Sequence, residues 1–78
     1  APLTKGAFSM YYSYSLDADS FQRPKAFIVK INRCQSLYET SVLETRVFPV
    51  CDPRHPNLYR KKAMNWAAAR CEQLRKAV

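Results

Sequence analysis

The chain has 78 residues and a formal net charge of +7 at pH 7. Its hydrophobic content of 47% and aromatic content of 13% are those of a folded protein and exclude an intrinsically disordered chain, although so short a domain has a thin core. A single glycine argues against a glycine-rich phosphate loop, and no apolar run approaches the roughly 20 residues of a membrane-spanning helix. We expect one small domain over residues 7–78, preceded by a flexible tail over residues 1–6.

The first predicted strand covers residues 7–16. Apolar and polar side chains alternate there with period two, and the segment is rich in aromatic residues, which is typical of a strand with one buried face. Residues 17–25 follow as a polar turn that Asp17 and Asp19 most simply stabilise. The buried face of the strand is expected to carry Phe8, Met10, Tyr12, Tyr14 and Leu16.

The second predicted strand covers residues 26–34. Phe27, Val29 and Ile31 fall on one face, which we expect to join the core. Lys30 falls on the opposite face. The apolar run over residues 27–29 makes this assignment of faces less regular than that of the first strand.

The third predicted strand lies within residues 41–50. Leu43 and Val47 share one face, and we expect both to be buried. Glu44 and Arg46 then point the opposite way. Pro49 lacks a backbone donor, which suits an edge strand or a strand end.

Residues 58–77 have the periodicity of an amphipathic helix. Asn57 is expected to cap it, because its side chain can accept a hydrogen bond from an amide of the first turn. The proline-containing link over residues 51–57 ends the sheet. The predicted fold is therefore α+β: a three-stranded antiparallel sheet with one face covered by a C-terminal amphipathic helix (β-β-β-α). The buried stripe of the helix is expected to carry Ala63, Met64, Ala67, Cys71, Leu74 and Val78.

Positive charge is concentrated in the last third of the chain. Residues 54–78 hold six of the seven net charges, which indicates a polyanionic or acidic partner. Arg60, Lys61 and Lys62 stand in the predicted first helical turn, where the helix dipole disfavours cations. Such a departure from ordinary helix design indicates a function, and a helix start with free amides and bases suits a phosphate. A solvated basic turn is the competing explanation.

These features favour a small, non-enzymatic nucleic-acid-binding module. Tyr11 beside Lys30 and Arg46 would form an aromatic and basic platform on the uncovered sheet face, on which bases stack. Cross-strand packing of aromatic residues is the alternative explanation for Tyr11. The expected nucleic-acid-binding residues are Arg54, Arg60, Lys61, Lys62, Lys30, Arg33, Arg46 and Tyr11.

The cysteines and the histidine give no sign of catalysis or metal binding. Three cysteines are an odd number, so Cys34, Cys51 and Cys71 are expected to be reduced and partly buried in a cytoplasmic protein. One disulfide with a free thiol is the alternative, in a secreted protein. The cysteines and His55 lack the close paired spacing of a zinc site. We therefore expect no metal, no cofactor and no enzymatic activity.

Two resemblances accompany this pattern. The β-β-β-α order ending in AMNWAAARCEQL resembles the small N-terminal arm-binding domains of phage integrases and the related AP2-type fold, which insert a sheet into the DNA major groove. The segment Cys34…Cys51-Asp52-Pro53 before a basic helix is similar to chemokines. Ser9, Met10 and Tyr11 stand where chemokines have paired cysteines, so both family disulfides are missing. No residue role is carried over from either family.

Other classes of function remain open beside nucleic-acid binding. The first is a protein-interaction or inhibitor module, phage- or plasmid-encoded, that engages an acidic protein. Such a module could also form a homodimer through a sheet edge. A secreted chemokine-like or effector-like protein is the further alternative. No interaction with a membrane is expected.

Overall fold

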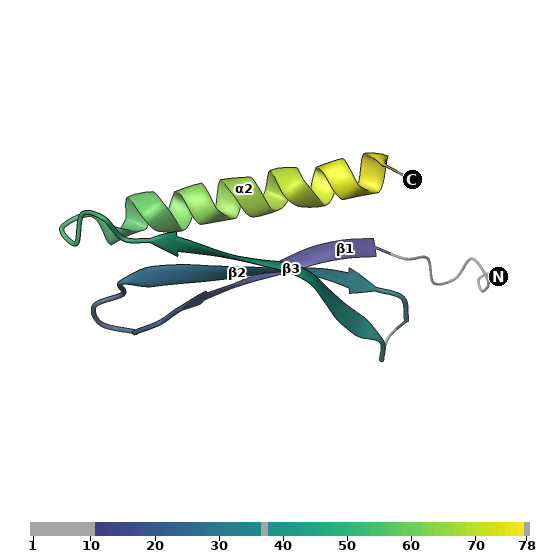
Figure 1. Cartoon of the computed structure of the whole chain (residues 1–78), viewed down its shortest axis with the longest axis horizontal. Coiled ribbons are helices and arrows are strands. Elements are labelled where there is room, and N and C mark those ends of the chain that lie inside the picture. Colours follow the sequence, from purple (N-terminus) through teal and green to yellow (C-terminus); the bar gives the residue numbers. More distant parts are fainter. Residues whose placement is uncertain (1–10, 37, 78) are drawn as a thin grey trace.

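A computed structural model of the chain describes residues 11–36 and 38–77 and has the predicted β-β-β-α architecture (Figure 1). The strands form one antiparallel sheet in the order β1-β2-β3, and the helix lies along one face of it. The predicted fold class is confirmed. The expected tail over residues 1–6 lies outside the described residues, as do Phe8, Met10 and Val78. The elements are β1 (Tyr11–Ala18), β2 (Ala26–Cys34), β3 (Thr40–Pro49) and α2 (Pro56–Lys76).

Asp19 closes the turn between β1 and β2. Its Oδ1 accepts hydrogen bonds from the amides of Lys25 at 2.8 Å and Ala26 at 3.3 Å, and its own amide donates to the Ala26 carbonyl at 3.2 Å. An aspartate that binds nearby backbone amides in this way stabilises a turn without glycine. The stabilising role predicted for Asp19 is confirmed. In the resulting register, Leu16 lies opposite Val29.

The core lies between β2 and α2. The predicted inward faces of β2 and of the helix are confirmed, because side chains from both elements are buried against each other. Alanine at two of the helix positions lets the helix backbone approach the sheet closely. Tyr12 and Leu16 of β1 and Leu74 of α2 pack around this centre, half-buried. The buried cluster consists of Phe27, Val29, Ile31, Ala63, Ala67 and Cys71.

The face of β3 that turns toward the helix is the opposite of the predicted one. Val47 is 54% exposed and Leu43 41% exposed, so the prediction that both are buried was wrong. Arg46 lies opposite Val29 in the ladder and therefore points to the helix side with it. A β-bulge between Ile31 and Asn32 leaves Leu43 without a partner on β2.

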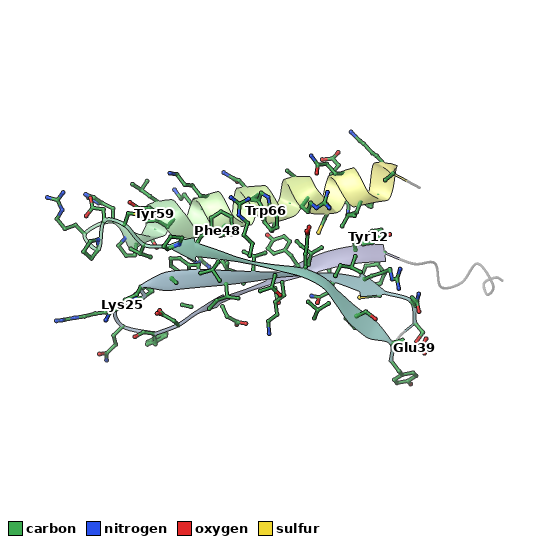
Figure 2. All side chains as sticks on the ribbon, in the orientation of Figure 1. Tyr12, Lys25, Glu39, Phe48, Tyr59 and Trp66 are labelled. Atoms are coloured by element: carbon green, nitrogen blue, oxygen red, sulfur yellow. The ribbon has the colours of Figure 1, made fainter. Side chains whose placement is uncertain are left out.

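The physical reason lies in the position of the helix, which lies over β1 and β2 and meets β3 only with its flank. The side chains on that flank are partners for polar as well as apolar groups. Phe48 of β3 lies next to Trp66 of α2 (Figure 2), and their ring centres are 5.8 Å apart. The guanidinium of Arg70 forms an ion pair with Glu44. Glu44, Arg46 and Phe48 therefore face the helix, and Thr45 and Val47 between them face away.

The helix begins two residues earlier than predicted. His55 occupies the N-cap position without a side-chain cap hydrogen bond, and Pro56 is the first helical residue. Proline suits this position because it has no N–H to leave unsatisfied. Asn57 is thus inside the first turn, and its predicted capping role was wrong. Arg60, Lys61 and Lys62 consequently lie in the second turn, where the unfavourable effect of the dipole on cations is small.

Candidate nucleic-acid interface

Three segments that are distant in sequence converge at one end of the molecule. The β1–β2 turn and the β3–α2 link lie side by side there, next to the start of α2 (Figure 1). The amide of Val50 in the link donates to the carbonyl of Lys25 at 2.8 Å, which joins the two loops. We call this region the basic end. Its bases are Arg23, Lys25, Arg54, Arg60, Lys61 and Lys62.

Arg23 and Lys25 belong to the basic end but were not among the binding residues predicted from the sequence. They line a cavity of about 370 Å³ together with Pro53 of the link and Pro56 at the start of α2. About 30 residues separate the two groups along the chain, so no local pattern connects them. The closing of the β1–β2 turn by Asp19 and the bond to Val50 place them together.

The basic side chains of the basic end differ in whether an acidic side chain neutralises their charge. Arg54 forms an ion pair with Asp52, with 3.1 Å between Nε and Oδ1, and its amide donates to the same oxygen at 3.0 Å. These bonds hold the pKa of the Asp52 carboxyl below its usual range. Asp19 is engaged with backbone amides. Within residues 11–36 and 38–77, by contrast, Arg60, Lys61 and Lys62 form no ion pair.

The start of α2 adds a shallow cavity between two of these bases. Arg54, Pro56 and Lys61 contribute to its lining, and its volume is about 220 Å³. No acidic residue stands in the first helical turn. On the β3 side, the ammonium of Lys62 lies 5.6 Å from the centre of the Tyr59 ring, which holds this lysine along the helix surface.

The predicted aromatic and basic platform on the uncovered sheet face is not assembled. Tyr11 and Lys30 do lie on the face away from α2, which we call the far face. Arg46, however, is on the helix side, with its guanidinium 4.7 Å from the centre of the Phe48 ring. The prediction that Arg46 joins Tyr11 and Lys30 was wrong because it followed from the inverted faces of β3.

Arg33 does not join the far face either. It lies opposite Tyr12 in the ladder and shares the face of Val29 and Ile31. Its Nε is buried, with no hydrogen-bond partner among the described residues. Of the eight predicted binding residues, the structure therefore gathers Arg54, Arg60, Lys61 and Lys62 at the basic end. It separates Tyr11, Lys30, Arg33 and Arg46 from them.

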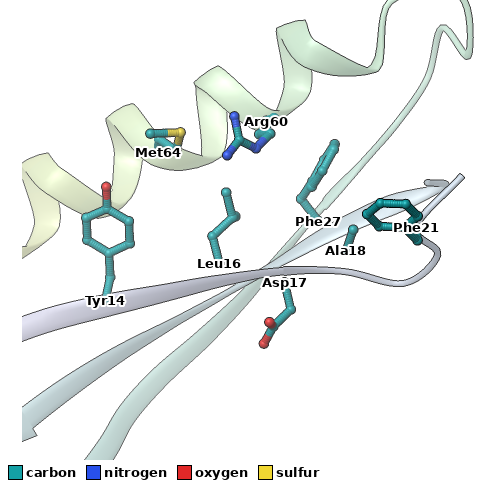
Figure 3. Close-up of a pocket in the computed structure, with 8 residues that line it drawn as sticks. All are labelled: Tyr14, Leu16, Asp17, Ala18, Phe21, Phe27, Arg60 and Met64. Carbon is teal, nitrogen blue, oxygen red and sulfur yellow. The ribbon is translucent and has the colours of Figure 1, made fainter. Parts of the chain in front are cut away.

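A groove runs between β1 and α2 and reaches the basic end at Arg60. Its volume is about 470 Å³, and Leu16, Phe27 and Met64 form part of its lining. Figure 3 shows Tyr14 and Leu16 pointing from β1 toward the helix, while Arg60 reaches down from α2 above them. We call it the β1–α2 groove. Sequence reasoning missed it because Tyr14 and Leu16 were assigned to a filled core.

The cysteines are unpaired and differ in exposure. Cys34 and Cys71 are buried, whereas Cys51 is exposed, so the prediction of partial burial was wrong for Cys51. Burial raises the pKa of the Cys71 thiol, and the nearby guanidinium of Arg75 offsets part of the rise. Hydrogen bonds to the sulfur of Cys34, first from Thr40, lower the pKa of that thiol. In the part of the chain that the structure describes, no group of three or more His, Cys, Asp or Glu side chains could hold a metal ion.

Two further properties of the chain concern its capacity to span a membrane and its similarity to known proteins in sequence and fold. Among the described residues, no helix is both long and apolar enough to cross a membrane. Comparisons with models of protein families, with curated proteins and with solved structures found no match to the chain.

Proposed function

We propose that the protein binds nucleic acid through the basic end. The observation that carries the proposal is the convergence of six bases from three segments, with only Asp19 and Asp52 as acids in the same segments. Both acids are already engaged within the protein. The remaining positive charge faces solvent and suits a polymer of phosphates.

The binding follows from elementary electrostatics. Nucleic acid carries a condensed layer of counterions, and each phosphate that a lysine or arginine neutralises releases some of them. Arg60, Lys61 and Lys62 present three such groups along one turn of α2, and Lys25 and Arg23 extend the surface across the link. Contacts of this kind position a protein on the backbone without reading the sequence.

Replacing Arg60, Lys61 and Lys62 together with alanine tests the proposal. The slope of log affinity against log salt should flatten by roughly 2–3 units as up to three phosphate contacts disappear. The fold should remain intact, because all three side chains are exposed and the contact of Lys62 with Tyr59 lies at the surface of a single helix. Binding to duplex and single-stranded DNA is measured by fluorescence anisotropy across a salt series.

A matched control variant removes the same number of charges elsewhere. Lys30, Arg75 and Lys76 are exposed and lie away from the basic end, on the far face and at the end of α2. Their replacement with alanine should leave the slope nearly unchanged. Equal losses in both variants would mean that net charge alone drives binding, and no loss in either would exclude the basic end as the binding surface.

A second candidate function is self-association through the far face. Val42 and Val47 are more than half exposed there, and Leu43 lies beside them on β3. The charged residues on the far face of the described strands are Lys30 and Asp17, one of each sign. Two copies could therefore stack these faces without the repulsion that a chain of net charge +7 meets elsewhere.

Sedimentation equilibrium tests this second candidate. The parent should show a monomer–dimer equilibrium, and Val42→Lys combined with Val47→Lys should shift it to monomer. A parent that remains monomeric at millimolar concentration would exclude it. The result does not bear on the basic end, which lies on other elements.

A further inference from the structure

We infer that the β1–α2 groove holds an unpaired base, so that the protein's preferred nucleic acid is a single strand. The inference rests on the proposed function and assigns the kind of nucleic acid that the basic end takes. It is carried by the position of the groove: Arg60 lines it and also belongs to the basic end. A strand whose phosphates lie along α2 would thus run directly past an apolar opening.

The lining of the groove has the chemistry of a base-stacking site. Phe21 borders it and is 99% exposed, so nothing in the described fold packs against its ring. Tyr14 borders it as well and is partly exposed, while Phe27 lies buried at its floor. Aromatic rings beside a basic surface are the recurring arrangement of proteins that bind single strands without sequence preference.

Arg60 supplies the charge at the rim. Its guanidinium projects from α2 over Leu16 and Phe27 (Figure 3), and it forms no ion pair with any described residue. Asp17, the acid among the lining residues, points away from the helix in the same view. A planar guanidinium can bind a phosphate and stack on a base at once, which a lysine ammonium cannot do.

Charge and the accessibility of the bases favour a single strand over a duplex or an apolar peptide as the occupant of the groove. A duplex keeps its bases stacked inside, so its binding gains nothing from Tyr14 or Phe21. An apolar peptide would match the lining but not Arg60 and the unpaired lysines beside it. A single strand matches both, because it is a polyanion with exposed aromatic faces. The volume of about 470 Å³ lies within the range of small-molecule sites, roughly 300–1,000 Å³.

The test is Phe21→Ala, with Tyr38→Ala as the matched control. Tyr38 is 93% exposed and stands in the β2–β3 loop at the other end of the molecule (Figure 1). Both substitutions remove one exposed aromatic ring, so neither disturbs the core. Anisotropy is measured with oligothymidylate and oligouridylate of about 12 nucleotides, within the roughly 4–16 nucleotides of small single-strand sites.

Phe21→Ala should weaken single-strand binding by about 5- to 150-fold, the loss expected for one stacked base. Loss on either strand supports the groove as the site. Duplex affinity and the binding of Tyr38→Ala should remain at the parental values. Photocrosslinking with bromodeoxyuridine should label the peptides that contain Tyr14 or Phe21.

Two results would overturn the inference. One is single-strand binding by Phe21→Ala that equals that of Tyr38→Ala and of the parent. The other is crosslinking confined to Tyr11 on the far face. In both cases the variant lacking Arg60, Lys61 and Lys62 would still show a flattened salt slope if the proposed function holds. If the salt slope of that triple variant were unchanged, the proposed function itself would be wrong.

Discussion

Arg46 and Trp66 form a cation–π contact that ties the edge strand β3 to α2. The guanidinium carbon of Arg46 lies 5.0 Å from the centre of the Trp66 ring and 4.7 Å from that of Phe48. The two rings are themselves in contact, tilted by 56° (Figure 2). A charged residue on the inward face of β3 is thereby accommodated without being buried. The same contact withdraws Arg46 from any surface on the far face.

We expect Arg46→Ala to destabilise the protein by about 0.5–2 kcal/mol, the range for an arginine over aromatic rings. Urea unfolding followed by the fluorescence of Trp66, the single tryptophan, measures the change. Arg23→Ala is the control, because Arg23 is exposed and its side chain has no hydrogen bond or ion pair recorded within the described residues. Equal stability of the two variants would contradict a structural role for the contact.

The variants Ile31→Ala and Leu43→Ala test which face of β3 is turned toward the helix. Both remove a side chain of similar size, and their free energies of unfolding are compared. Ile31 is fully buried beneath α2, so Ile31→Ala should cost about 2–5 kcal/mol, a large part of the stability of so small a domain. Leu43→Ala should cost less than about 1 kcal/mol, because the side chain is already 41% exposed. Thermal and urea unfolding give both values. A large cost at Leu43 would mean that a second copy covers the far face.

The raised pKa of Cys71 predicts a loss of stability in alkali. A thiol whose folded-state pKa is raised contributes stability that is complete below its unfolded-state pKa, about 8.5, and is lost as the pH rises through the folded-state value. The parent should therefore lose stability above that pH relative to Cys71→Ala. Urea titrations of both proteins at a series of pH values on either side of about 8.5 measure the difference. A constant difference at every pH would contradict the shift.

Thiol accessibility should separate Cys51 from the other two cysteines. Cys51 is exposed, whereas Cys34 and Cys71 are buried. A thiol reagent applied to the native protein should modify Cys51 rapidly and the buried pair only after unfolding. Peptide mapping by mass spectrometry identifies the modified residues. Rapid modification of Cys71 in the native state would show that α2 is not held against the sheet.

Lys25 and Lys30 differ in the surface they occupy and not in their charge. Lys25 belongs to the basic end, and Lys30 lies on the far face. Lys25→Ala should lower the slope of log affinity against log salt by roughly 0.7–0.9 units, the share of one phosphate contact. Lys30→Ala should leave it unchanged. The opposite result would place the nucleic acid on the far face of the sheet.

Local pattern accounts for most of the fold. The bounds predicted for β2 coincide with those of the structure, and those predicted for β3 and α2 differ by at most two residues at each end. Strand alternation and helical periodicity placed Val29, Ala63 and Ala67 in the core because these elements are covered along their middle. The same logic failed for Val47 and Leu43, since α2 lies over β1 and β2 and meets β3 only with its flank, where Trp66 and Arg70 contact polar partners.

The sequence by itself determined the order of the elements, the stripe of α2 that is buried and the excess of bases in the last third of the chain. These properties depend on residues close together along the chain, whose side chains share a face by the geometry of helix and strand. Only the tertiary structure decided which bases lie together. It brought Arg23 and Lys25 to Arg60, Lys61 and Lys62, turned Arg46 toward Trp66, and left a groove between β1 and α2. Those relationships depend on how the sheet twists against the helix, which no local pattern contains.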